Sequence, residues 1–325
     1  GADGMRVAML MSTSAGNDVM FDEALCEQGR NFGNKIWNAY RLINMWEVDN
    51  NLAQSDAARE ACAWFDEVML QRVERINRDM EQYRISEAFM EIYRLFWDDF
   101  SGWYLEIIKP AYQTPIDAAT LARTKQYVDM LLRLLHPFMP FITEEIWQDL
   151  ATEKEAVSIC IARAPKAERK ADEGILARFE LAKEVITAIR NIRKQRNIAQ
   201  KEALTLHYIA DENYPAEYAA VIAKMGNMKA MEAVEEKDST AAAFIVKTTQ
   251  YFVPMEGKID REAELEKLNA DLAYYEGFLQ SVMKKLSNER FVQSAPEKVV
   301  ANERAKQSDA EAKIAALKEQ IAALQ

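Results

Sequence analysis

Residues 265–286, LEKLNADLAYYEGFLQSVMKKL, place an apolar side chain at alternating steps of three and four positions. This spacing is the a/d seam of a coiled coil, and it runs through Leu265, Leu268, Leu272, Tyr275, Leu279, Val282 and Leu286. A second seam with the same steps is made by Ile314, Leu317, Ile321 and Leu324. Pro296 breaks the helix between the two seams. The pattern predicts an antiparallel coiled-coil hairpin over 258–325 with its tip near 288–297.

A parallel dimer through the same seams is the alternative arrangement. The break at Pro296 disfavours it, because two seams on one chain can cover each other by folding back. We therefore expect the chain to be a monomer.

The sequence before the hairpin predicts a helical bundle. Only 10 Gly and 8 Pro occur among the 325 residues, and 49% of the residues are hydrophobic, which favours a well-ordered, mostly helical protein. Apolar residues recur at helical spacing in 22–46, 55–80, 86–108 and 116–135, and a further helix is expected to begin at Thr143. Helices of this length joined by short loops predict an antiparallel bundle over 1–170.

The segment 171–257 differs in its periodicity. A helix is expected from Glu173 to about Arg196, after which apolar and polar residues alternate in 203–209, 243–247 and 251–253, as in β-strands. A short helix is expected over 215–224 between them. The fold class predicted for the whole chain is mainly α: a helical bundle at 1–170, a small α/β connector at 171–257 and a coiled-coil arm at 258–325.

The charge of the chain is uneven. The 41 Lys and Arg against 52 Asp and Glu give a net charge of −11, which argues against indiscriminate binding to nucleic acid. Residues 183–201 nevertheless hold six basic groups and one acidic group, and residues 284–306 hold six basic and three acidic groups. Two local basic stripes on an acidic protein are compatible with a limited, specific RNA footprint, and each stripe alone is also compatible with an ordinary solvated helix face.

Motifs for catalysis and for metal binding are absent from the sequence. It contains no glycine-rich phosphate loop, HExxH or GxSxG, and the adjacent carboxylates at 98–99 and 144–145 point about 100° apart on a helix, so neither pair can share one site. The cysteines Cys26, Cys62 and Cys160 and the histidines His136 and His207 show no metal-ligand spacing, and His136 is expected to be a core or capping histidine. We expect no catalysis and no metal in this chain, and a reducing cytosol as its compartment.

The stretch RNFGNKIWNA at 30–39 is unusually rich in amides and cations for a helix. Asn is a poor helix former, so three Asn in eight residues call for a compensating role. One interpretation is hydrogen bonding to neighbouring loops. The other is recognition of base edges, for which Asn and Arg carry suitable donors and acceptors.

Five stretches also carry a family resemblance: GADGMR at 1–6, RNFGNKIWNAYRL at 30–42, FWDDFSGWYLEIIKP at 96–110, LLHPFMPFITEEIWQ at 134–148 and LSNERFVQSAPEKVVANERAK at 286–306. Together they resemble the C-terminal part of bacterial valyl-tRNA synthetases, which belong to the class Ia aminoacyl-tRNA synthetases. The bundle motifs are shared more loosely with the isoleucyl and leucyl enzymes. The hairpin with LSNxxFVxxAP is the more specific valyl feature.

The resemblance implies an anticodon-binding bundle, a connector and an arm that contacts the outer corner of tRNA. The family's ATP-site signatures, HIGH and KMSKS, do not occur here, so we expect a fragment that binds tRNA-Val without aminoacylating it. ATP with Mg²⁺ would then be used only by the full-length enzyme to attach valine, and this fragment would hold no cofactor. The resemblance also implies a cytoplasmic protein with no DNA or membrane partner.

Three groups of residues are the expected RNA contacts. The anticodon group is Arg30, Asn31, Asn34, Lys35 and Asn38; the inner-stem group is Arg190, Arg193, Lys194 and Arg196; the arm group is Lys284, Lys285, Arg290, Arg304 and Lys306. None of the arm cations falls on the a/d seam, so their charges are expected to be free to meet phosphate. Two alternatives are the equivalent part of an isoleucyl or leucyl enzyme, and a helical protein-interaction scaffold with no RNA role.

Overall fold

The computed structural model of the chain describes residues 1–12, 22–150, 156–236, 241–255, 261–288 and 296–324, except for the side chains of 261–264, 266–267, 297, 323 and 324. The chain divides into two compact units, Gly1–Ala177 and Arg178–Gln325. This division falls after the expected boundary at 170, and the expected connector and arm share the second unit. The three-domain division stays a prediction.

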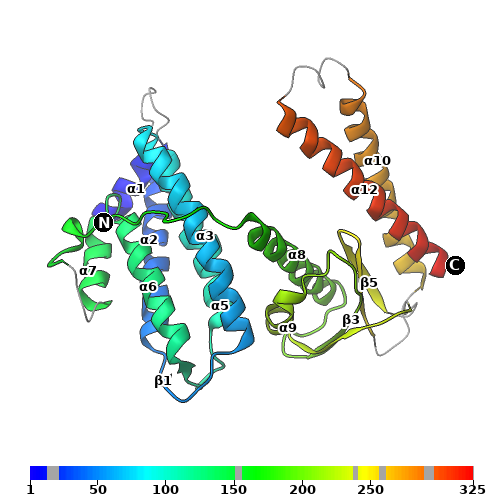
Figure 1. The fold of residues 1–325 in the computed structure, drawn as a ribbon, viewed down its shortest axis with the longest axis horizontal. Coiled ribbons are helices and arrows are strands. Elements are labelled where there is room, and N and C mark those ends of the chain that lie inside the picture. Colours follow the sequence, from blue (N-terminus) through cyan, green and yellow to red (C-terminus); the bar gives the residue numbers. More distant parts are fainter. Residues whose placement is uncertain (13–21, 151–155, 237–240, 256–260, 289–295, 325) are drawn as a thin grey trace. The chain divides into compact units, whose positions relative to one another are not determined.

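The first unit is built from helices that pack side by side (Figure 1). Its elements are α1 (Ala2–Ser12), α2 (Glu23–Asn44), β1 (Val48–Asp49), α3 (Asp56–Glu81), α4 (Ile85–Arg94), the π-helical η1 (Leu95–Tyr104), α5 (Leu105–Ile108), β2 (Ile116–Asp117), α6 (Ala118–Leu135), α7 (Pro140–Leu150) and the 3₁₀ turn η2 (Ile159–Ile161). Asp22, Ser55 and Asp117 begin α2, α3 and α6 with a side chain that accepts from the first turn. The prediction of a mainly helical fold with a bundle is confirmed.

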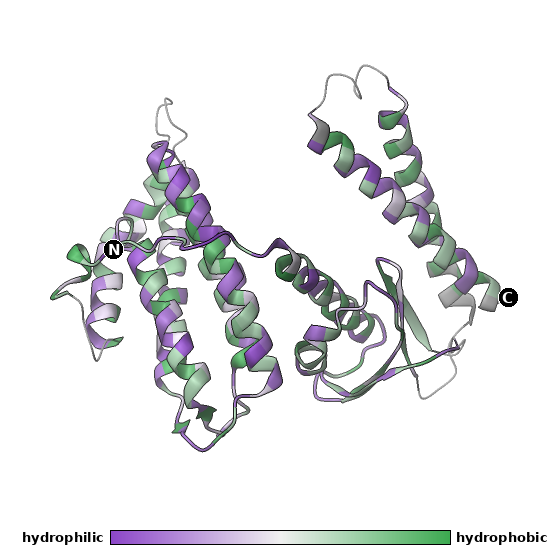
Figure 2. Ribbon diagram, in the orientation of Figure 1, coloured by the Kyte–Doolittle hydropathy of each residue, from purple (hydrophilic) through white to green (hydrophobic). Residues whose placement is uncertain are grey.

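Aromatic side chains fill the core of this unit. Phe65 stacks on Tyr104 with ring centroids 4.8 Å apart, and Tyr127 meets the edges of both rings. Each of these three residues is at most 1% exposed. Figure 2 shows the helices with both hydrophilic and hydrophobic faces, as an amphipathic bundle requires. Within 86–108, Phe89, Phe96, Phe100 and Tyr104 are each at most 2% exposed and lie in this core.

The helix expected over 86–108 contains a π-helical stretch. Over Leu95–Tyr104 the helix has π geometry, in which hydrogen bonds join residues five apart. Its buried residues are Leu95, Phe96, Asp99, Phe100, Ser101 and Tyr104. Tyr104 is fully buried, whereas the neighbouring Trp103 is only half-buried.

The segment before α8 crosses α3 and is held there by one carboxylate. Glu67, which is 4% exposed, accepts from the Arg169 guanidinium, with one N–O distance of 2.7 Å, and from the backbone N–H of Asp172 at 2.8 Å. Asn77 donates to the carbonyl of Pro165 at 3.2 Å. The hydrogen bond from Arg169 is the main reason why the pKa of Glu67 is lowered below its ordinary value.

Replacing Glu67 with glutamine should therefore destabilise the first unit in a pH-dependent way. Because the folded-state pKa is depressed, the ionised Glu67 contributes stability above its unfolded pKa of about 4.3, and this contribution is lost as the pH falls through the folded value. The difference between wild type and Glu67→Gln should be full at pH 7 and shrink as the pH falls below about 5. Urea unfolding at pH 7 and at a pH below about 5 measures this difference in the free energy of unfolding. Glu81→Gln, at an exposed position on the same helix, is the control. A pH-independent difference would contradict the assignment.

The second unit contains a four-stranded sheet with the strand order β4-β3-β6-β5. Its elements before the arm are α8 (Glu173–Gln195, which begins in the first unit), β3 (Leu204–Ile209), η3 (Ala216–Tyr218), α9 (Ala219–Gly226), β4 (Met228–Ala233), β5 (Ala242–Val246) and β6 (Thr249–Val253). Strand β4 pairs parallel to β3, and the other two pairings are antiparallel. Strand β4 was not predicted, because its sequence MKAMEA consists of residues that favour helices.

The predicted hairpin is present as α10 (Arg261–Leu286) and α12 (Glu297–Leu324). Leu268, Leu317 and Ile321 form a buried cluster, and Leu265, Leu272 and Tyr275 pack against it. Two ion pairs show that the helices are antiparallel, since Glu276 pairs with Lys318, whereas Lys285 further along α10 pairs with Glu303 earlier in α12. The tip at 289–295 lies outside the described residues. Among the helices of the described ranges, none is long and apolar enough to span a membrane.

Candidate RNA-binding surfaces

The five residues expected to contact the anticodon share one face of α2. An α-helix turns about 100° per residue, so positions 30, 31, 34, 35 and 38 fall within an arc of about 140°. Arg30, Asn31, Asn34 and Asn38 are exposed and Lys35 is half-buried. The opposite face is buried, through Phe32, Ile36, Ala39, Tyr40 and Ile43. The helix therefore presents this polar arc to solvent.

Neighbouring side chains orient two of these cations. The Lys35 ammonium lies 5.4 Å from the ring centroid of Trp97, and Arg30 pairs with Glu27 at 3.1 Å. Trp97 itself stacks on Tyr93. A cation above a ring keeps its charge while its position is restricted, which suits a contact that must be placed accurately.

A cavity of about 420 Å³ opens beside the polar arc. Arg30, Asn34 and Trp37 line it from α2, and Met139 and Phe141 line it from the start of α7. The side chains of Trp37 and Phe141 are 39% and 65% exposed. Neither aromatic is among the residues predicted to contact RNA. Trp37 lies within the amide-rich stretch and on a different side of the helix from Phe32. This position in the sequence could have indicated that Trp37 belongs to the site.

The first residues of the chain hold this wall in place. Asp3 accepts from the backbone N–H groups of Phe141 and Ile142, at 3.4 and 2.8 Å, and so caps the N-terminus of α7. Arg6 donates to the carbonyls of Pro137 and Phe138 at 2.8 and 3.0 Å. Helix α7 begins at Pro140 rather than at the expected Thr143, since proline is favoured in a first helical turn.

The inner-stem group is corrected at one position. Arg193 is 1% exposed and donates to the carbonyls of Ala199, Gly226 and Asn227 at 2.9 to 3.1 Å. Burial lowers the pKa of its guanidinium. Arg193 therefore holds the turns after α8 and α9 together and is not available to RNA. Of the other three members, Arg190 and Lys194 are exposed and Arg196 is half-buried.

The arm group is also modified by its surroundings. Glu303 is 7% exposed and pairs with Lys306 at 2.7 Å and with Lys285 at 3.6 Å, so these two charges are partly compensated. The hydrogen bond from Lys306 is the main cause that lowers the pKa of Glu303. Lys284 and Arg304 are exposed, and Arg290 lies outside the described residues. The expectation that all these charges are free is thus wrong for Lys285 and Lys306.

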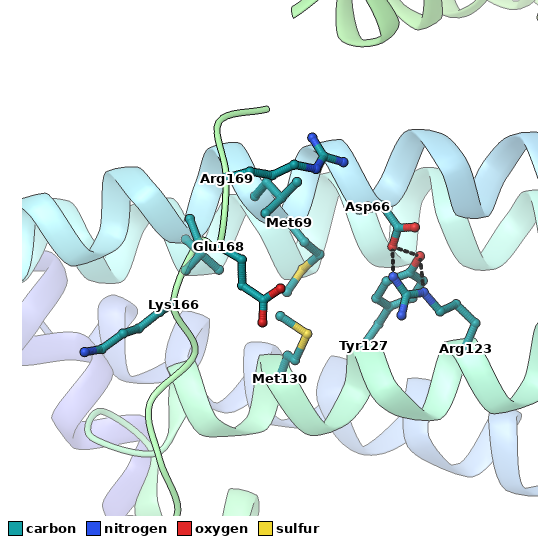
Figure 3. A pocket seen from close by; sticks show the side chains of 11 residues that line it. Asp66, Met69, Arg123, Tyr127, Met130, Lys166, Glu168 and Arg169 are labelled. Atoms are coloured by element: carbon teal, nitrogen blue, oxygen red, sulfur yellow. Dashed lines mark hydrogen bonds and ion pairs between the residues drawn. The ribbon is translucent and has the colours of Figure 1, made fainter. Parts of the chain in front are cut away.

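A larger pocket of about 510 Å³ lies between α3, α6 and residues 166–169 (Figure 3). Met69 and Met130 form part of its apolar wall. At its rim Asp66 pairs with Arg123 and accepts from the Tyr127 hydroxyl at 2.5 Å. Burial raises the pKa of Tyr127, which is therefore neutral.

Comparisons with known proteins identify the family of the chain. A family model described as the anticodon-binding domain of tRNA ligase matches residues 62–208, and one described as the valyl tRNA synthetase tRNA binding arm matches residues 260–325. Valine–tRNA ligase of Phocaeicola vulgatus is 53% identical over 326 residues and that of Parabacteroides distasonis 50% over 324, each covering 100% of this chain. The chain belongs to the valyl-tRNA synthetase family. The ligase of Thermotoga maritima is 33% identical over 302 residues, or 92% of the chain.

Family membership confirms the resemblance. The match to the valyl arm model favours a valyl enzyme over the alternatives, which were the equivalent parts of an isoleucyl or a leucyl enzyme. The chain spans 37% of the length of the first two relatives. The match to the anticodon-binding family model begins at residue 62, so the choice of Arg30, Asn31, Asn34, Lys35 and Asn38 stays a prediction. Within the described residues, His136, Glu144 and Cys160 form a group that could hold a metal ion.

Proposed function

We propose that this chain binds tRNA, with the α2 polar arc on the anticodon loop and the hairpin on the outer corner. The observation that carries the proposal is the exposed arc of amides and cations beside a cavity with two exposed aromatics. Unstacked bases in RNA loops are recognised by such a combination, since aromatic rings stack on bases while amides and cations read their edges. The descriptions of the two matching family models support the same partner.

For the whole protein we propose the activity in the relatives' names, ligation of valine to tRNA. The substrate would be tRNA-Val, and ATP with Mg²⁺ would be bound by parts of the protein that correspond to the remaining length of the relatives. We propose that this chain contributes binding and positioning without catalysis, as a monomer whose hairpin covers its own seam. A cytoplasmic location is part of the same proposal.

The anticodon assignment predicts a loss of discrimination in the double variant Asn34→Ala, Lys35→Ala. Each base-edge contact contributes about 1–3 kcal/mol of discrimination, so preference for tRNA-Val over the same tRNA with a changed anticodon should fall about tenfold or more. Filter binding or fluorescence titration with both transcripts measures the ratio. Arg59→Ala, an exposed cation on α3, is the control and should leave it unchanged. An unchanged ratio in the double variant would remove the arc from anticodon recognition.

The arm assignment predicts a different signature for Lys284→Ala, Arg304→Ala. These two are exposed and have no ion pair with Glu303, whereas replacing Lys306 would also remove the closer cation of Glu303. Each lost phosphate contact should reduce the slope of log K against log salt by about 0.7–0.9, and affinity should fall for all tRNAs alike. Lys318→Ala, at an exposed position paired with Glu276 nearer the other end of the hairpin, is the control. A slope equal to that of wild type would contradict the assignment.

A further inference from the structure

Three potential metal ligands from separate parts of the first unit converge at one end of α7. They are His136, which caps the C-terminus of α6, Glu144 in α7 and Cys160 in η2. The ligand atoms lie within 4.8 Å of one another, and His136 Nε2 is 3.1 Å from Cys160 Sγ. These residues show no metal-ligand spacing along the chain, so the expectation of no metal site rested on spacing alone, but folding brings them together.

The hydrogen bonds around His136 decide which ring nitrogen carries the proton. The Thr143 hydroxyl donates its one hydrogen to the carbonyl of Met139 at 2.8 Å. With the hydroxyl hydrogen placed on Met139, the 2.8 Å contact between Thr143 Oγ1 and His136 Nδ1 is donated by Nδ1–H, and this is the tautomer that a metal bound at Nε2 requires. Nε2 is therefore left with a lone pair, and this lone pair faces the thiol of Cys160.

The carboxylate of Glu144 is oriented in a similar way. It accepts from Ser158 Oγ at 2.7 Å and from Gln148 Nε2 at 2.6 Å. Ser158 in turn accepts from the backbone N–H of Cys160 at 3.1 Å, which fixes the turn that carries the thiol. The backbone N–H of Ile159 also donates to the Glu144 carboxylate. A carboxylate offers about four acceptor positions, so these three donors leave room for one further partner. Partners of this kind, which orient the ligands of a metal, are what a protein metal site requires beyond the ligands themselves.

We propose that His136, Glu144 and Cys160 bind a divalent cation of the Zn²⁺ type. Nitrogen and thiolate ligands select zinc over magnesium or calcium, which prefer oxygen. Around a tetrahedral Zn²⁺, with bonds of about 2.0–2.3 Å, ligand atoms lie roughly 3.3–3.8 Å apart, so small shifts of side chains complete the site. The ion takes the place of the thiol proton between Sγ and Nε2, and this proton is released to solvent.

The proposed metal site is open to solvent at Cys160. Cys160 is exposed, so the ion can enter from solvent, and a water molecule completes the coordination at the fourth position. Bound Zn²⁺ would join the end of α6, α7 and the η2 turn at one point. The site thus acts as a metal-dependent clasp on the helical unit.

Cobalt substitution tests the proposal directly. The metal-free 325-residue chain, kept reduced by a phosphine that does not bind the ion, is titrated with Co²⁺ and then with Zn²⁺. We expect a thiolate-to-cobalt absorption band that saturates at one equivalent and is displaced by Zn²⁺. The band should be lost in Cys160→Ser and His136→Asn, and kept in the matched variants Cys26→Ser and His207→Asn. No saturable band in the wild type, or an unchanged band in Cys160→Ser, would overturn the proposal.

Two further measurements separate a metal site from a hydrogen-bonded cluster. Thr143→Val removes the acceptor of Nδ1–H with little change of shape, and affinity for Zn²⁺ should fall about 10–100-fold. Zn²⁺ should also slow alkylation of Cys160, followed peptide by peptide, and leave the rates at Cys26 and Cys62 unchanged. Equal alkylation rates at Cys160 with and without Zn²⁺ would mean that the cluster is held by hydrogen bonds alone. Circular dichroism confirms that each variant is folded.

Discussion

Replacing Gly29 with alanine should lower the free energy of unfolding of the helical unit by about 3 kcal/mol or more. A Cβ at this position would lie 2.5 Å from the carbonyl oxygen of Gly4 and 3.0 Å from its Cα. Both are backbone atoms of α1, which have no rotamer to adopt, so α1 and α2 would have to separate. The separation would also disturb Asp3 and Arg6, which hold the start of α7.

Gly33 supplies the matched control on the same helix. A Cβ there meets only the ends of Met139 and Ile142, at 3.7 and 3.8 Å, which are ordinary contacts. Gly33→Ala should therefore be neutral or stabilise the unit by roughly 0.5–1 kcal/mol, because alanine loses less backbone entropy than glycine in a helix. Urea unfolding followed by tryptophan fluorescence measures both variants. The six tryptophans all lie between residues 37 and 147, so the signal reports the first unit alone.

Equal stabilities of the two alanine variants would show that the contact between α1 and α2 is looser than described. A large loss of stability confined to Gly29→Ala would instead show that α1 and α2 are in close contact at Gly29, next to Arg30 of the α2 polar arc. In that case tRNA binding by Gly29→Ala should weaken as well, since the Met139 and Phe141 wall of the cavity depends on α1 through Asp3.

The elements that could be predicted are those whose sequence pattern repeats. The seam from Leu265 to Leu286 and the amphipathic pattern of 22–46 each extend over several turns, so they predict α10 and α2 closely. Strand β4 could not be found, because MKAMEA is a strand only through its pairing with β3. The π-helical stretch was missed because hydrogen bonds between residues five apart leave no mark in a 3.6-residue pattern.

The candidate sites follow the same rule. The α2 polar arc was predictable because five residues on one helix share a face whatever the helix packs against. The convergence of His136, Glu144 and Cys160 was not, since it depends on the turn that brings η2 back to α7. The charge of Arg193 was read correctly, but its burial depends on the chain around residues 226 and 227, more than thirty positions away.

Arg193 therefore provides the second large prediction: Arg193→Ala should destabilise the α/β part by about 3 kcal/mol and leave RNA affinity per folded molecule nearly unchanged. The variant removes the hydrogen-bond donors of three backbone carbonyls. One of them, the carbonyl of Gly226, lies at the C-terminus of α9, where the helix dipole favours a cation. Arg193→Lys should recover only part of the loss, because one ammonium cannot span the three acceptors as the planar guanidinium does.

Lys194→Ala is the control for Arg193, since it removes one exposed charge from the same helix and should change stability by under about 0.5 kcal/mol. Because the second unit has no tryptophan, its unfolding is followed by hydrogen exchange of the β3 and β6 amides, while tryptophan fluorescence should report an unaltered first unit. The two roles of Arg193 make opposite predictions. A phosphate ligand would leave stability intact and reduce the salt slope of tRNA binding by about 0.7–0.9, and that result would restore Arg193 to the inner-stem group.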